Sequence, residues 1–108
     1  MGKKEKTAYM ITSGVVVDPS RMPEYLKGAA PLFDKAGAEE LAFGHENAKN
    51  IDLLEGKWEH PGLVMIYKFP SMDAIRKFWD SPEYQAVKKF RDDGVVDPNF
   101  TIAIEDRN

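Results

Sequence analysis

Residues 63–69 read Leu-Val-Met-Ile-Tyr-Lys-Phe and give the clearest strand signal in the chain. The run is apolar at nearly every position, so both faces of this strand need cover. A helix is predicted to follow, with Ser71 as its N-cap and its end at Trp79. Residues 81–83 (Ser-Pro-Glu) then supply a cap, a proline and an acid in the order that begins a second helix, which is expected to end near Arg91.

The sequence before this region contains a further strand and a further helix. Residues 7–17 (TAYMITSGVVV) are rich in β-branched and aromatic residues and predict a first strand that ends at a turn. Apolar residues recur at three- and four-residue spacing over 22–36, which predicts a helix with one buried stripe, and Gly37 is expected to end it. Shorter or half-buried strands are expected over residues 39–45, 51–54 and 99–105.

The order of these elements predicts an α+β fold. Strand, helix, strand with a hairpin extension, strand, helix pair and strand is the split βαβ order of ferredoxin-like domains, with an antiparallel sheet and helices on one face. The strands over 7–17 and 63–69 are apolar on both sides, so the other face of the sheet also needs cover. A second copy of the same sheet would supply it, which predicts a homodimer through the sheet face. At 108 residues the chain suits one domain, expected over 7–108 after a flexible N-terminus at 1–6.

Composition excludes several classes of function. The net charge is −3 and the basic residues are interleaved with acids, which argues against a nucleic-acid partner. No apolar run approaches the roughly 20 residues of a membrane span, and the N-terminus lacks the pattern of a secretory signal, so we expect a cytoplasmic protein without membrane contact. The absence of cysteine excludes disulfides, thiolate metal sites and cysteine nucleophiles.

The residues over 69–84 also carry a family resemblance. Phe-Pro-Ser-Met-Asp-Ala at 69–74 and Trp-Asp-Ser-Pro-Glu-Tyr at 79–84, preceded by Leu-Glu-Gly at 54–56, resemble domain-of-unknown-function family 1330. The resemblance runs from about Tyr9 to Ile104. It implies membership of the dimeric α/β barrel group, in which two ferredoxin-like chains pack sheet against sheet. That group includes cofactor-free monooxygenases, haem-degrading enzymes and muconolactone isomerases, so the resemblance implies a fold and a dimer and leaves the reaction open.

The chain departs from the family pattern at one place. Residues 43–46 read Phe-Gly-His-Glu, where an Arg followed by two Gly is usual. His45 belongs to this departure and lies at the end of the strand predicted over residues 39–45. Its imidazole has a suitable intrinsic pKa for a general base at neutral pH. Glu55, before Gly56, is a second candidate proton acceptor. For both residues the alternative is a structural or solvated side chain.

Cofactors are not expected. No pair of a histidine and a nearby glutamate has the helical spacing typical of a metal site, and none of the predicted helices contains a histidine that could bind haem.

Three residues of the helix pair are candidates for substrate binding. Arg91 shares a helix face with Tyr84, so its guanidinium is expected to face the groove between helix and sheet and to bind the carboxylate of a small organic anion. Trp79 and Tyr84 would form aromatic walls of that pocket. The alternatives are an ion pair or helix cap for Arg91 and simple core packing for the aromatic residues. Together these features predict a small-molecule-binding homodimer, with a cofactor-free enzyme and a non-catalytic binding or regulatory module as the two alternatives.

Overall fold

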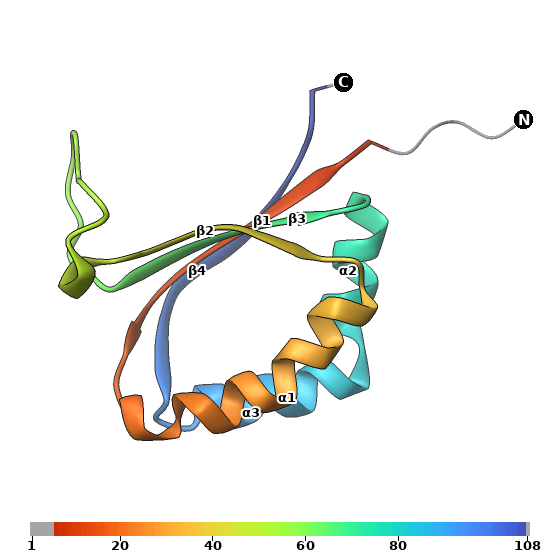
Figure 1. The fold of residues 1–108 in the computed structure, drawn as a ribbon, viewed down its shortest axis with the longest axis horizontal. Coiled ribbons are helices and arrows are strands. Elements are labelled where there is room, and N and C mark those ends of the chain that lie inside the picture. The colour runs from red at the N-terminus through yellow and green to blue at the C-terminus, as the bar shows by residue number, and fades with distance from the viewer. Residues whose placement is uncertain (1–5, 108) are drawn as a thin grey trace, which may run out of the picture.

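A computed structural model describes residues 6–107 as a four-stranded antiparallel sheet with three helices against one face (Figure 1). The predicted flexible N-terminus, apart from Lys6, lies outside the described residues. Two short 3-10 turns, η1 (Pro19–Arg21) and η2 (Glu46–Ala48), interrupt the connections. The main elements are β1 (Ala8–Val16), α1 (Met22–Lys35), β2 (Glu39–His45), β3 (Leu63–Phe69), α2 (Met72–Asp80), α3 (Pro82–Asp92) and β4 (Val96–Glu105).

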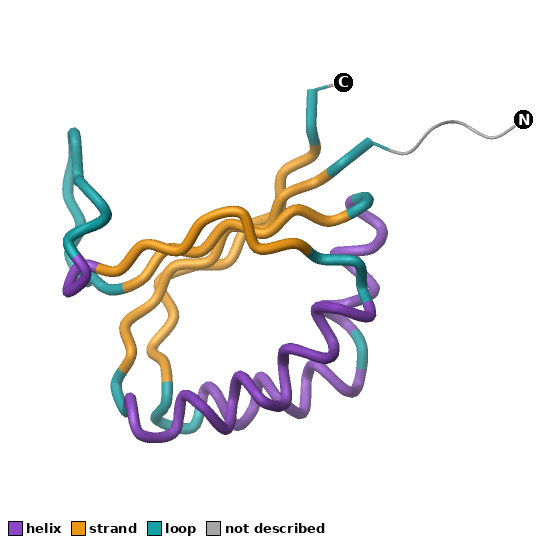
Figure 2. The backbone as a smooth tube through the Cα atoms, in the orientation of Figure 1, coloured by secondary structure: helices purple, strands orange, loops and turns teal. Residues whose placement is uncertain are grey.

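The strand order in the sheet is β2-β3-β1-β4, and every neighbouring pair is antiparallel. The two central strands are therefore β3 and β1, the two that the sequence marks as apolar on both faces. The predicted α+β ferredoxin-like fold is confirmed. Figure 2 shows the sheet bending around the helices, so that its helix-facing side is concave.

The boundaries of the helix pair follow from side-chain caps. The Ser71 hydroxyl accepts a hydrogen bond from the Ala74 amide at 3.0 Å and begins α2. The Ser81 hydroxyl accepts one from the Tyr84 amide at 3.1 Å, and proline follows it at the first turn of α3. One serine thus ends the first helix and begins the second, which sets the side chains of both helices at fixed positions over the sheet.

The predicted strand over residues 51–54 is wrong. This segment is part of a loop between η2 and β3, and Leu54 within it is 92% exposed. The Asn50 side chain explains the difference, because its amide accepts from the His45 N–H and donates to the Phe43 carbonyl at 2.9 Å each. These are the backbone groups at the end of β2 with which a strand at 51–54 would have to pair. The last strand is also longer than predicted, since β4 begins at Val96 and not at residue 99.

The core lies between the helices and the concave side of the sheet. Aromatic rings dominate it: the Phe33 ring stacks on Tyr67 with centroids 4.5 Å apart, and Phe78 packs on Tyr84 at 4.4 Å. The buried residues of this cluster are Ala8, Met10, Tyr25, Ala29, Phe69, Ile75, Phe78 and Tyr84.

The opposite face of the sheet carries none of the described helices (Figure 1). Strand pairing places Ile11 between Ile66 and Ile102 on this face. Ile102 and Ile104 are 50% and 55% exposed, although they belong to the sheet. The loop after η2 projects on this side as well. The chain therefore leaves an apolar surface, which we call the bare sheet face, open to its surroundings.

Candidate functional site

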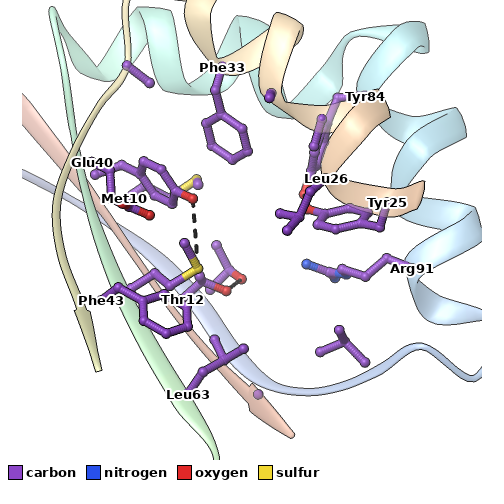
Figure 3. Close-up of a pocket in the computed structure, with 18 of the residues that line it drawn as sticks. Met10, Thr12, Tyr25, Leu26, Phe33, Glu40, Phe43, Leu63, Tyr84 and Arg91 are labelled. Carbon is purple, nitrogen blue, oxygen red and sulfur yellow. Dashed lines mark hydrogen bonds between the residues drawn. The ribbon is translucent and has the colours of Figure 1, made fainter. Parts of the chain in front are cut away.

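A pocket of about 490 Å³ lies between the concave side of the sheet and helices α1 and α3 (Figure 3). We call it the main pocket. Its volume falls in the range of roughly 300–1,000 Å³ that is typical of small-molecule sites. All four strands contribute to its wall, so the site is formed by the fold as a whole.

Strand alternation selects the side chains that line the sheet side of the main pocket. Met10 and Thr12 of β1 pair with Tyr67 and Met65 of β3, and all four point toward the helices. The Tyr67 hydroxyl lies 3.7 Å from the Met65 sulfur, to which it donates. Burial, and then the negative charge of Glu40, raise the pKa of the Tyr67 hydroxyl well above its ordinary value. Tyr67 is therefore a protonated donor at neutral pH.

A register shift in β2 brings a carboxylate into the wall. Glu40 pairs with Tyr67 and Phe43 pairs with Met65, with Leu41 left over as a β-bulge between them. In a regular strand, residues three apart point to opposite faces; the bulge lets both Glu40 and Phe43 face the main pocket. Glu40 is exposed to solvent, so its carboxylate lies at the rim. This placement could not be predicted from the sequence, because the bulge has no Gly or Pro to mark it.

Two tyrosine hydroxyls meet at the helix side of the main pocket. The Tyr25 and Tyr84 oxygens are 3.0 Å apart, and Tyr84 is only 1% exposed. Burial, with a smaller contribution from Tyr25, raises the pKa of the Tyr84 hydroxyl far above 10, although the charge of Arg91 acts in the opposite direction. The Tyr84 hydroxyl is therefore protonated at pH 7. One hydroxyl donates to the other, and the second hydroxyl hydrogen is left for a further acceptor.

Arg91 lies on the same side of the main pocket, with its guanidinium directed inward (Figure 3). The residue is 7% exposed and its Nε and Nη2 lie 3.2 and 3.1 Å from the Asp92 carboxylate. Nη1 takes part in neither bond. Burial alone would raise the pKa of Asp92, but a 2.8 Å hydrogen bond from Lys88 and the charge of Arg91 outweigh it and lower that pKa. Both sequence interpretations of Arg91, ion pair and pocket wall, thus describe the same side chain.

The five residues predicted from the sequence are only partly brought together. Trp79, Tyr84 and Arg91 all line the main pocket, and the Trp79 ring lies 5.5 Å from that of Tyr84. His45 and Glu55 do not line it. The His45 Nδ1 accepts from the Asn47 amide at 3.0 Å and caps η2, while Glu55 lies in the exposed loop. Neither residue lines the main pocket, and their role as proton acceptors stays a prediction.

Tyr25 and Glu40 line the main pocket and are not among the site residues predicted from the sequence. Within residues 6–107 we find no group of three histidine, aspartate or glutamate side chains placed to hold a metal ion. None of the helices in the described part of the chain is long and apolar enough to cross a membrane.

Comparison with solved structures places the fold among known proteins. A protein of unknown function from Rhodopseudomonas palustris is similar with a TM-score of 0.66 and 17% identity, over 96% of this chain and 83% of that chain. A hydroxynitrile lyase from Passiflora edulis is similar with a TM-score of 0.65 and 11% identity, over 98% and 97% of the two chains. A protein from Thermobifida fusca, described as a dimeric ferredoxin-like protein of unknown function, has a TM-score of 0.56 and 13% identity, over 98% and 94%.

These identities are low, so the similarities establish the fold alone. No curated protein matches the chain in sequence. The model of the family described as "domain of unknown function (DUF1330)" matches residues 7–103, which is nearly the whole of the described structure. The resemblance seen in the Phe-Pro-Ser-Met-Asp-Ala and Ser-Pro-Glu-Tyr segments is thereby confirmed, and the chain belongs to the DUF1330 family.

Proposed function

We propose that this protein binds a small, largely apolar organic anion in the main pocket, as a cytoplasmic homodimer in which residues 7–108 form one domain. The observation that carries the proposal is the uneven wall of the pocket. Its interior is mostly apolar, whereas Arg91 and the Tyr25–Tyr84 hydroxyl pair gather on one side (Figure 3). An apolar cavity with a few convergent polar groups is the usual form of a small-molecule site.

The charge at the polar side selects the chemistry of the ligand. Arg91 is buried, and the Asp92 carboxylate that neutralises it is shared with Lys88. The Arg91 guanidinium, which is directed into the pocket (Figure 3), and the Tyr84 hydroxyl are both donors, so the matching ligand group is an acceptor with negative charge, such as a carboxylate. The apolar body of the ligand would then lie against Phe33, Leu26 and Met10.

The homodimer is supported by the bare sheet face. Isoleucines that are half exposed in one chain would be covered by the equivalent surface of a second chain, in an isologous contact. The Thermobifida fusca protein of the same fold is described as dimeric. The lack of cysteine suits the reducing cytoplasm.

A cofactor-free enzyme is the second candidate, and Glu40 is the observation that favours it. Its carboxylate is across the main pocket from Arg91 (Figure 3), where it could accept a proton from a ligand held at the other side. Tyr84 and Tyr67 cannot serve as bases near pH 7, because burial keeps them protonated. A non-catalytic binding module needs no such acceptor. If the protein is an enzyme that uses this carboxylate, Glu40→Gln should abolish turnover. If it is a binding module, the same change should leave its ligand affinity unchanged.

Fluorescence titration tests the binding proposal. The chain has two tryptophans, and Trp58→Phe leaves Trp79 in the pocket wall as the only one. We expect its emission to change on titration with aromatic and aliphatic carboxylic acids, and to change far less with their methyl esters, which match them in shape and lack the charge. Equal responses to acids and esters would contradict an anion site. No response to any member of a broad panel would contradict the proposed function.

A further inference from the structure

A second, smaller recess lies beside the main pocket, between α2 and the outer strand β4. We call it the side recess. Its volume is about 200 Å³, and its lining is mostly apolar, with Met10 and Ile75 buried and Ala103 exposed. Arg76 and Asp80, of opposite charge, belong to the exposed part of its lining. The volume is below the roughly 300 Å³ from which small-molecule sites usually begin, so the side recess is too small for an independent ligand.

The side recess and the main pocket share part of their walls. Met10, Trp79 and Thr101 line both cavities. Two of these residues are held in place by the sheet: Met10 is 2% exposed, and the Thr101 hydroxyl lies 2.7 Å from the Thr12 hydroxyl. These three side chains form the partition between the two cavities.

Trp79 is the largest of the three, and it belongs to a helix end. It is the residue before the last of α2, after which the chain turns at Ser81 into α3. Its ring is only partly buried and contacts the Tyr84 ring and, at 5.8 Å, the Lys88 ammonium. Removal of this ring would join about 490 Å³ and about 200 Å³ into one elongated cavity.

We propose that Trp79 sets the length of the aliphatic monocarboxylate that fits the main pocket by closing it off from the side recess, and that the pocket extends into the side recess only when this ring is removed. The inference rests on the proposed function, because it takes the carboxylate to lie at Arg91. The apolar lining of the side recess matches a hydrocarbon end, and Tyr84, which lines the main pocket, does not line this recess. Trp79 is in this proposal a specificity-determining residue.

The experiment is calorimetric titration with straight-chain alkanoates from butanoate to dodecanoate. With the unchanged protein, affinity should rise with chain length and then stop rising at the length that reaches Trp79. With Trp79→Ala it should continue to rise over several further methylenes, by up to about fourfold for each, the fold-change that corresponds to burying one methylene. Trp79→Leu, with a smaller loss of packing, should show the same extension over fewer methylenes and serves if Trp79→Ala does not fold.

A matched control fills only the side recess. Ala103 lines that recess and not the main pocket, so Ala103→Phe should leave the profile of the unchanged protein as it is. In the Trp79→Ala background it should return the profile to the original length limit. If Trp79→Ala and Trp79→Leu bind short acids normally and gain nothing with longer ones, the partition is wrong while the proposed function stands. If other acids of the panel bind the unchanged protein and no alkanoate of any length does, the inference alone is overturned; if no acid binds, both are overturned.

Discussion

Replacing Arg91 with methionine separates the ion pair of this residue from its proposed contact with a ligand. Methionine keeps an unbranched apolar stem in the wall of the main pocket and removes the charge. Loss of a charge-assisted hydrogen bond corresponds to about 2 kcal/mol, or about a 30-fold weaker affinity for a carboxylate. The affinity for the methyl ester of the same acid should fall far less, because the ester has no negative charge to pair with the guanidinium.

The effect on stability should be small for a structural reason. Asp92 keeps its 2.8 Å hydrogen bond from Lys88, and its side chain is 37% exposed, so water compensates part of the loss. A partly exposed ion pair contributes at most about 1 kcal/mol. For a domain of this size that corresponds to a fall in Tm of roughly 4–8 °C at most.

The assay combines thermal unfolding with titration of an acid and its ester, and Lys88→Met is the matched control. Lys88 is the other partner of Asp92 and does not line the main pocket. Its replacement should lower Tm to a similar extent and leave acid affinity unchanged. If Arg91→Met lowers Tm as Lys88→Met does and acid affinity is the same in all three proteins, Arg91 is an ion-pair residue only, and the reasoning is refuted.

Three further outcomes are expected. Tyr84→Phe removes one hydroxyl of the 3.0 Å pair and should weaken acid binding about fivefold, the equivalent of about 1 kcal/mol, with a lower Tm; an unchanged affinity in titration would exclude this hydroxyl from the site. Ile104→Glu adds charge to the bare sheet face and should convert a two-chain particle into a one-chain particle in light scattering, whereas a dimer that persists would place the interface elsewhere. The pKa of Asp92 is lowered in the folded state, so its carboxylate stabilises the fold above about pH 4, and that contribution is lost as pH falls through the folded-state pKa. Asp92→Asn should remove this part of the acid dependence of Tm. An identical dependence of Tm on pH in the two proteins would contradict the assignment.

The fold could be predicted from the sequence because local signals and the global pattern agree. Ser71 and Ser81 each make the capping bond that their positions predict, and the run at 63–69 forms β3 with the expected bounds. The apolar character of this run on both faces also identifies it as a central strand. Such agreement between propensity, capping and burial is what makes a fold predictable from one sequence.

The site was less predictable, because it depends on contacts between distant segments. Helical spacing alone placed Tyr84 and Arg91 on one face, and both line the main pocket. Spacing within one helix could not show that the Tyr25 hydroxyl, 59 residues earlier, meets that of Tyr84. The strand predicted over 51–54 failed for a similar reason, since a single asparagine side chain bonds the edge of β2 that the strand needed.

The bulge at Leu41 offers a direct test of how the chain brings Glu40 into the pocket wall. Deletion of Leu41 would leave Glu40 and Phe43 two residues apart, the spacing at which a regular strand points both to the same face. We therefore expect this deletion to leave the fold and acid binding nearly intact, measured by circular dichroism and by titration. The matched control is deletion of Ile102 from β4, the other outer strand, which pairs regularly with β1 around that position. There a missing residue reverses the faces of the residues beyond it and should lower Tm sharply. If both deletions destabilise the protein equally, the extra residue at Leu41 is not what keeps Glu40 and Phe43 on one face.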